Sequence, residues 1–258
     1  VNLYSPGKNP KSNLLFLTFI INTLKAVYDN QDLLRASIYN VGNQNRLGAH
    51  EAPPSIISIF LGTEVSRMLE LMEKAVVDRK MTPDEKTALK LNIGRIPEII
   101  LDSTDRNRTS PFAFTGNRFE FRAVGSSANN ASALIVLNTV MAEQLNKFKS
   151  AVDRLIEKGV KKDEAIFKIL KDLIIESKPI LFNGDGYSEE WLIEAAKRGL
   201  TNVNNVPEAL NAYKRPEAVR MFSKLGVLNE RELNGRVEVE YEKFVMKLQI
   251  ESRVLGDI

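Results

Sequence analysis

Apolar residues recur every three or four positions across residues 134–155, and this rhythm constrains the fold more than any other feature of the chain. Because an α-helix turns once every 3.6 residues, side chains at this spacing form one apolar stripe on a single long helix. Gly159 follows the stripe, at a position where glycine typically ends a helix. The rhythm returns at residues 163–177 and again after Asn229 and Glu232, a pair typical of a helix start. The second half of the chain is therefore predicted to be almost wholly helical.

The first half combines helices with short strands. Residues 14–28 carry an apolar stripe at helical spacing, whereas residues 55–61 (SIISIFL) form a β-branched run closed by Gly62. Residues 118–122 (RFEFR) alternate charged and aromatic side chains, as a strand with one buried face does. The chain is thus predicted to have an α+β fold that is mostly helical.

Composition excludes several classes of protein. The 258 residues are 43% hydrophobic and 27% charged, which is typical of globular domains and not of disorder. The net charge is +3 and the basic residues are interleaved with acidic ones, so neither composition nor patterning indicates nucleic-acid binding. No apolar run reaches the roughly eighteen residues of a membrane helix. The absence of cysteine excludes disulfides, zinc–thiolate sites and thiol catalysis, and fits a cytoplasmic protein.

Four arginines and a glutamate gather in one stretch, DRNRTSPFAFTGNRFEFR. If its last residues form a strand, Arg118, Glu120 and Arg122 line one face, because successive side chains alternate between faces. Arg106 and Arg108 precede them among turn-forming residues. Guanidinium groups match carboxylates and phosphates, and a glutamate can hold a hard divalent cation. The alternative is a polar strand face whose side chains extend into water.

A second polar stretch, residues 41–52 (VGNQNRLGAHEA), is predicted to be a loop because it is rich in glycine and side-chain amides. It carries Arg46, Glu51 and the single histidine of the chain, His50. Ionisable groups on such a loop favour a functional role. A lone histidine beside a loop more often packs or forms hydrogen bonds, so His50 is assigned no catalysis.

Taken together, the two polar stretches resemble glutamine synthetases. NRLGAHEAP resembles the flap loop of that family, where an arginine is followed closely by Glu-Ala-Pro. RNRTS and RFEFR, some fifty residues further on, resemble its paired active-site arginine segments in order and spacing. The longer spellings around both motifs, with the helices that follow, resemble the large bacterial type III branch. The resemblance implies antiparallel strands with packed helices in residues 1–145, the C-terminal part of the catalytic domain, and an all-α extension in residues 146–258.

The resemblance also implies an activity and substrate-binding residues. That family joins ammonia to glutamate with ATP, through a γ-glutamyl phosphate, using two divalent ions, Mg²⁺ or Mn²⁺. Glu51 would be the flap glutamate, which closes over the intermediate and helps take a proton from ammonium. Arg46 would touch bound glutamate near its reacting γ-carboxylate, and Arg122 would hold a substrate carboxylate.

On the nucleotide side, the resemblance assigns three further residues. Arg108 would face the transferring phosphate, Arg118 would lie beside the ATP, and Glu120 would be a ligand of the metal ion that bridges the phosphates. These residue types suit the chemistry, because phosphoryl transfer requires charge neutralisation more than covalent help. Arg106 matches a basic family position without an assigned role.

The sequence departs from the family pattern in two places. The segment between the arginine groups, TSPFAFTG, is shorter than in the common bacterial form and lacks its further arginine, and His50 stands where a tyrosine is common. The metal-binding first half of the family has no counterpart here, and the chain starts at Val1 without a methionine, so we expect it to be a piece of a longer protein. A single carboxylate should not retain Mg²⁺, so these residues alone are not expected to make glutamine.

Other functions remain open from the sequence. A γ-glutamyl-amine or polyamine ligase of the same superfamily would share the phosphoryl chemistry and differ in the acceptor. The long amphipathic helices could instead form a non-catalytic helical assembly module in which the arginines are structural. For an intact enzyme, the resemblance implies a large ring-shaped homo-oligomer in the cytoplasm.

Overall fold

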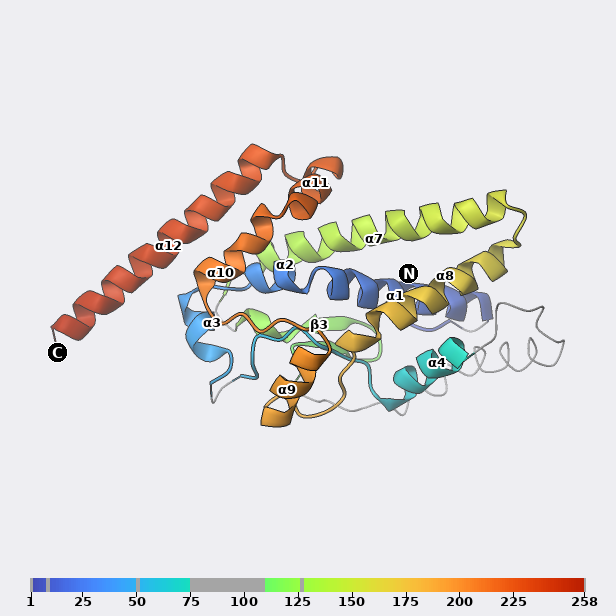
Figure 1. Cartoon of the computed structure of the whole chain (residues 1–258), viewed down its shortest axis with the longest axis horizontal. Coiled ribbons are helices and arrows are strands. Elements are labelled where there is room, and N and C mark those ends of the chain that lie inside the picture. The colour runs from blue at the N-terminus through green and yellow to red at the C-terminus, as the bar shows by residue number, and fades with distance from the viewer. Residues whose placement is uncertain (1, 8–9, 50–51, 75–109, 126–127, 258) are drawn as a thin grey trace. The chain divides into compact units, whose positions relative to one another are not determined.

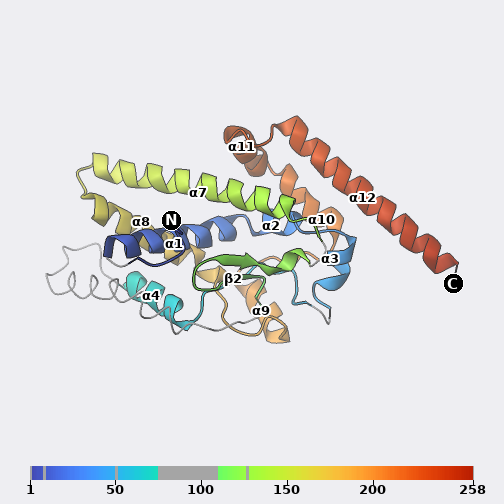
Figure 2. The same cartoon turned by 180° about the vertical axis from the view of Figure 1, so that it is seen from behind.

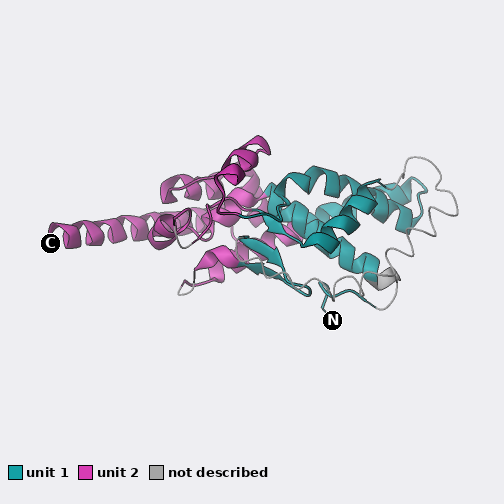
Figure 3. Cartoon of the chain, turned by 90° about the horizontal axis from the view of Figure 1, so that it is seen from below, with its two compact units in different colours: residues 1–29, 58–121, 144–185 teal, residues 30–57, 122–143, 186–258 magenta. Residues whose placement is uncertain are grey.

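The computed structural model describes residues 2–7, 10–49, 52–74, 110–125 and 128–257. The chain divides into two compact units, coloured separately in Figure 3. The first unit consists of residues 1–29, 58–121 and 144–185, and the second of residues 30–57, 122–143 and 186–258. Each unit is therefore assembled from segments that are distant in the sequence. The boundary expected at residue 145 from the family resemblance stays a prediction.

Helix packing forms the core of the first unit. Helix α1 (Pro10–Asp29) packs along α8 (Lys162–Ser177), and α4 (Thr63–Lys74) packs against α8 in turn (Figures 1 and 2). The apolar stripe of α1 is almost completely buried, with Ile20, Ile21 and Leu24 fully inaccessible to solvent. Because burying one such side chain contributes about 1.5–3 kcal/mol, α1 is a major source of stability for this unit.

The sheet of the first unit has three short strands in the order β1-β2-β3. These are β1 (Ile59–Phe60), β2 (Phe112–Phe114) and β3 (Phe119–Phe121). The β2–β3 pair is antiparallel, as expected, but the β1–β2 pair is parallel. The mostly helical α+β fold is thus confirmed. The strand predicted over residues 55–61 is reduced to two ladder residues, although the whole run is buried.

The other edge of β1 is covered by a segment from much later in the chain. Leu181 forms a parallel bridge with Ile59, and the amide of Phe182 donates to the Ile59 carbonyl oxygen at 3.0 Å. This segment follows α8 and the short 3₁₀ helix η2 (Lys178–Ile180). An uncovered strand edge would present unpaired backbone groups, so the later segment completes the sheet.

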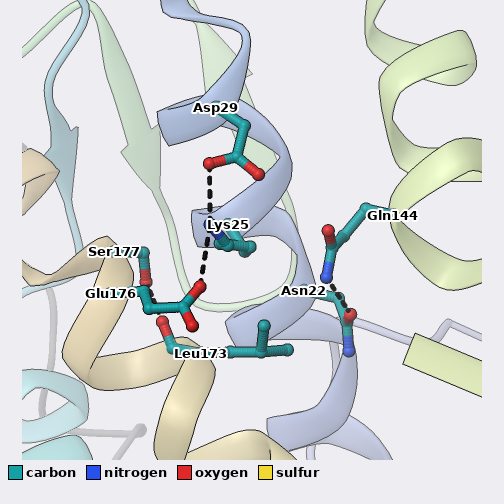
Figure 4. Close-up of polar contacts among 7 residues, drawn as sticks. All are labelled: Asn22, Lys25, Asp29, Gln144, Leu173, Glu176 and Ser177. Atoms are coloured by element: carbon teal, nitrogen blue, oxygen red, sulfur yellow. Dashed lines mark hydrogen bonds and ion pairs between the residues drawn. The ribbon is translucent and has the colours of Figure 1, made fainter. Parts of the chain in front are cut away.

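Two polar contacts tie α1 to its neighbours inside the first unit (Figure 4). The buried amide of Gln144 donates to the Asn22 side-chain oxygen at 3.0 Å. Lys25 lies between Asp29, at 2.7 Å on α1, and Glu176, at 2.9 Å on α8. Burial alone would lower the pKa of Lys25, but the hydrogen bonds to both carboxylates outweigh it and raise the pKa. Lys25 therefore remains charged and links the two helices.

The second unit is almost entirely helical. It contains α2 (Gln31–Ala36), α3 (Val41–Arg46), η1 (Arg122–Val124), α9 (Glu189–Lys197), α10 (Val206–Leu210), η3 (Asn211–Lys214), α11 (Pro216–Lys224) and α12 (Glu230–Gly256). The long helix α7 (Ala131–Glu157) contributes residues to both units.

Local signals predicted the ends of several of these helices correctly. Asn229 and Glu232 form the expected capping box of α12, in which each side chain accepts a hydrogen bond from the backbone amide of the other residue. Ser188 caps α9, the helix with the buried Trp191. Gly159 follows α7 with a φ of +86°, a conformation that favours glycine.

Helix α12 is buried only near its start. Leu233 and Val237 are buried in the second unit, whereas every residue from Val245 to Asp257 is exposed, including several apolar ones. In the described part of the chain, no helix combines the length and apolar character needed to cross a membrane.

Candidate functional site

Arg46 lies at the end of a helix that the sequence predicted to be loop. Residues 41–46 form α3, whose N-cap is Asn40 with its side chain accepting the Asn43 amide. The prediction was wrong here because a short polar helix leaves no apolar stripe to read. Six residues are too few for a helix to be stable by itself, so α3 depends on contacts with other segments.

The buried side chain of Asn43 supplies most of these contacts. Its Nδ2 donates to the carbonyl oxygens of Ile38 at 2.7 Å, Ala123 at 3.0 Å and Val124 at 3.1 Å. Its Oδ1 accepts from Arg46 Nε at 2.9 Å. Asn43 therefore joins α3, the chain before it and η1 in one hydrogen-bonded cluster.

The guanidinium of Arg46 is held in one orientation by this cluster. Besides the bond to Asn43, its Nη2 donates to the Ala123 carbonyl oxygen at 3.0 Å. Arg46 is half-buried, and within the described residues its Nη1 has no hydrogen-bond partner. A guanidinium fixed at two nitrogens can present the third to an anionic ligand without losing further side-chain freedom.

The loop after α3 is closed at its base. Leu47 and Ala52 form a bridge, and the Gly48 amide donates to the carbonyl oxygens of Ala52 and Pro53, both at 3.1 Å. Gly48 has a φ of +84°, which its lack of a side chain allows without strain. The expected flap residues His50 and Glu51 lie outside the described residues.

The predicted common face of Arg118, Glu120 and Arg122 is only partly formed. Arg118 immediately precedes β3 and Glu120 lies within it, but Arg122 begins the 3₁₀ helix η1. The strand alternation thus stops at Phe121, and Arg122 belongs to the second unit with Arg46, whereas Arg118 and Glu120 belong to the first. Arg106 and Arg108 lie outside the described residues.

Arg118 and Glu120 form an ion pair in the first unit. Arg118 donates from Nε and Nη2 to Glu120 Oε1, both at 3.3 Å. The Arg118 side chain is 69% exposed and that of Glu120 35% exposed, so water screens the pair. The pair is therefore weak enough for either group to be redirected towards a ligand.

The metal ion implied by the family requires more ligands than these residues provide. Among the described residues, no group of three or more histidine, cysteine, aspartate or glutamate side chains could hold a metal ion. Glu120 is a single carboxylate beside a cation, and hard divalent ions take several oxygen ligands. The described residues do not by themselves fit the metal.

A cavity of about 930 Å³ lies in the second unit. It is lined by residues that include Tyr39, Val136, Tyr213, Phe222 and Arg236, from the segment after α2, α7, η3, α11 and α12. Burial raises the pKa of Tyr213. Arg46 and Arg122, the predicted site residues that are described in this unit, do not line the cavity.

Comparison with known proteins shows what this chain is similar to. A family model described as the glutamine synthetase C-terminal domain matches residues 165–258. Over its whole length, the chain is 63% identical to a glutamine synthetase of Bacteroides fragilis and 41% identical to a type-3 glutamine synthetase of Dictyostelium discoideum. Over its whole length, the chain is thus similar to glutamine synthetases. A glutamine synthetase of Butyrivibrio fibrisolvens is 36% identical over 267 aligned positions that cover the chain completely. The predicted resemblance, including the type III branch, is thus confirmed.

The chain spans about a third of the length of the relatives it matches. It covers 35%, 34% and 36% of the three synthetases, in the order given. A complete synthetase of this family therefore contains large regions in addition to the segment that aligns here.

Sequence reasoning missed two residues that hold this part of the chain together, Asn43 and Arg35. Arg35 is 1% exposed and donates from Nε to the Ser55 carbonyl oxygen at 2.6 Å and from Nη1 to Thr201 Oγ1 at 2.9 Å. Burial lowers its pKa to about 10, which still leaves it charged at neutral pH. A usable signal for Asn43 was its position three residues after Asn40, the spacing of a cap and its partner.

Proposed function

We propose that the site residues predicted from the sequence form part of the active site of an enzyme that makes glutamine from glutamate and ammonia with ATP. In this proposal, Arg46 and Arg122 bind carboxylates of the substrate and Glu51 assists deprotonation of ammonium. Arg108 and Arg118 stabilise the phosphates of ATP. Glu120 contributes one ligand to a divalent ion, Mg²⁺ or Mn²⁺, whose chemistry is to neutralise phosphate charge when it is bound. The remaining ligands come from regions of the longer enzyme that lie outside this chain.

The geometry of Arg46 carries this proposal. Its guanidinium is fixed by Asn43 and the Ala123 carbonyl oxygen, and Nη1 remains available among the described residues. Attack by ammonia requires the γ-carboxyl group of glutamate to be held in one place, and a pre-oriented arginine lowers the entropic cost of holding it. Arg46 also stands five residues before Glu51 in the sequence, so one short segment would serve both the carboxylate and the incoming ammonia.

The test uses a full-length glutamine synthetase that contains this sequence. Glutamine formation is measured for the wild type, Glu51→Ala and Glu120→Gln, with Glu217→Gln, a change on the exposed surface of α11, as the control. We expect both site variants to lose at least about 100-fold in kcat, because each removes a charge needed at the reacting groups. Full activity in both site variants would contradict the assigned roles.

The same assay addresses the amine acceptor. Ammonia is replaced in turn by a monoamine and by a polyamine at equal concentration. We expect ammonia to be the preferred acceptor, and a higher kcat/KM with a polyamine would redirect the proposal to a γ-glutamyl-amine ligase. The 258-residue chain alone is expected to form no glutamine.

We also propose that the intact enzyme is a cytoplasmic homo-oligomer. The exposed apolar residues of α12, among them Met246, Ile250 and Leu255, provide a surface that another chain or segment can cover. Light scattering on the full-length enzyme measures its mass, and a monomer would contradict the proposal.

A further inference from the structure

The segment Thr201-Asn202-Val203-Asn204-Asn205-Val206 connects α9 to α10 and lies within the region that matches the C-terminal domain. Its backbone is bonded to helices from a distant part of the sequence. Thr201 N donates to Gln31 Oε1 at 3.2 Å, and the Val203 carbonyl oxygen accepts from the Tyr39 hydroxyl at 2.7 Å. A segment without regular structure has acquired partners for its backbone in α2 and in the residues just after it.

Arg35 of α2 forms the centre of this attachment. Its guanidinium donates to the hydroxyl and the carbonyl oxygen of Thr201 and to the carbonyl oxygen of Ser55. The Ser55 hydroxyl, in turn, donates to the Val203 carbonyl oxygen. Ser55 lies three residues after Ala52, whose bridge to Leu47 closes the loop that follows α3. Residues 201–206 therefore also hold the chain just after this loop.

Gln44 connects the segment directly to the helix that carries Arg46. Val206 is the first residue of α10, and its amide has no acceptor within that helix. The amide donates instead to Gln44 Oε1 at 2.8 Å. Gln44 lies two residues before Arg46 on α3.

These contacts matter because α3 is short. With six residues it has few internal hydrogen bonds, so its position depends on the groups that hold it. Asn43 holds one side of α3 through η1, and Gln44 holds it through Val206. A shift of α3 would move the Arg46 guanidinium away from the Ala123 carbonyl oxygen that orients it.

We propose that residues 201–206 of the C-terminal domain are a positioning element for Arg46, acting through Gln44 and Arg35, and thereby set the affinity of the enzyme for glutamate. This inference rests on the proposed function, in which Arg46 binds the glutamate carboxylate. It assigns to the C-terminal domain a role in substrate binding. Gln44 and Arg35 touch no substrate themselves and act only through the placement of α3.

The experiment measures steady-state kinetics of the full-length enzyme with glutamate and ATP varied separately. Gln44→Met removes the acceptor for the Val206 amide at nearly constant side-chain volume, and Gln44→Glu restores an acceptor oxygen at the same place. Ser188→Ala is the matched control, because it removes one hydrogen bond to a helix amide in the same domain, at the start of α9. Thr201→Val removes the hydroxyl that accepts from Arg35.

We expect Gln44→Met to raise the KM for glutamate about five-fold, the equivalent of one lost hydrogen bond, with the KM for ATP and kcat changed less than about two-fold. Gln44→Glu should restore the wild-type KM, and Thr201→Val should raise it in the same direction. Equal effects on both substrates, or the same kinetics in Gln44→Met and Ser188→Ala, would overturn the proposal. If Gln44→Met does not fold, an unchanged KM for glutamate in Thr201→Val overturns it. A wild-type enzyme that makes no glutamine would instead refute the proposed function.

Discussion

Replacing Asn43 with alanine would test whether α3 is held in place by one side chain. The substitution removes the Nδ2 donor from three carbonyl oxygens and the Oδ1 acceptor from Arg46. The Ala123 carbonyl oxygen keeps its second donor, Arg46 Nη2, but those of Ile38 and Val124 lose the bond from Asn43. Asn43 is only 4% exposed, so water cannot easily replace the missing hydrogen-bonding groups.

The expected cost follows from these bonds. A hydrogen bond to a charged group such as Arg46 contributes about 1.5–3 kcal/mol, and each neutral one about 1 kcal/mol net. Counting the Arg46 bond and the two acceptors left without Asn43, the free energy of unfolding should fall by about 3–5 kcal/mol. If the hydrogen bond from Arg46 Nη2 to the Ala123 carbonyl oxygen becomes stronger in the variant, the loss of unfolding free energy will lie at the lower end of this range.

Urea unfolding followed by tryptophan fluorescence measures this change where it occurs. Trp191 is the only tryptophan and is buried in the same unit as Asn43, so its emission reports the unfolding of that unit. With a denaturant dependence of about 2–3 kcal/mol per M, the unfolding midpoint should fall by about 1–2 M. Far-ultraviolet circular dichroism then follows the helices of both units.

Asn138→Ala is the matched control. Asn138 lies exposed on α7 and donates to the Leu134 carbonyl oxygen at 2.8 Å within its own helix. Because alanine favours helices, this change should alter stability by less than about 0.5 kcal/mol. An Asn43→Ala variant no less stable than Asn138→Ala would refute the idea that Asn43 holds α3 and Arg46 together.

Two further predictions concern pH and backbone conformation. Burial raises the pKa of Tyr213, so the folded state favours the neutral side chain. The unfolded state therefore ionises first as the pH rises. The free energy of unfolding should be unaffected below pH 10 and should fall by about 1.4 kcal/mol per pH unit above it. Urea midpoints at pH 9 and pH 11 should therefore differ less for Tyr213→Phe than for the wild type, and equal differences would contradict the assignment. Gly159→Ala should destabilise by about 1 kcal/mol, because its φ is +86° and a methyl group there meets only open space. Gly235 lies inside α12, where an added methyl group also meets open space, so Gly235→Ala should stabilise the protein by about as much. Calorimetry measures the melting temperatures of both variants. If both melting temperatures shift in the same direction, the φ of Gly159 is not the cause.

Elements with strong local signals could be predicted from the sequence. The apolar stripe of α7, its glycine stop and the capping box of α12 depend on residues within a few positions of each other. Such signals remain readable because they do not require a distant partner. The 27 residues of α7 and of α12 show how far local periodicity extends in this chain.

Elements that depend on distant partners could not be predicted. α3 is helical because Asn43 reaches residues 80 and 81 positions away and Gln44 reaches Val206, 162 positions away. The β-branched run at residues 55–61 is buried throughout, but only Ile59 and Phe60 find a neighbouring strand in β2. Burial and β-propensity thus indicated an interior segment without specifying its pairing.

The candidate site divides in the same way. The spelling of the two polar stretches was sufficient to indicate a resemblance to glutamine synthetases, because both stretches match that family in order and spacing. The orientation of Arg46 was not accessible, since it is set by a backbone carbonyl 77 positions later in the chain. The separation of Arg122 from the strand face was missed because alternation was extended one residue beyond the end of β3.

The packing of α8 along α1 has a consequence for biosynthesis. Translation reaches α1 before α8, so the buried face of α1 receives Gln144 and α8 only after more than a hundred further residues have been translated. Until then, a helix with a nearly continuous apolar stripe is without its native cover, and such intermediates are prone to aggregate. Translation of the region through α8 at about 5–20 residues per second takes on the order of ten seconds or more. Throughout that interval, the emerging chain should be a client for chaperones that bind apolar helices.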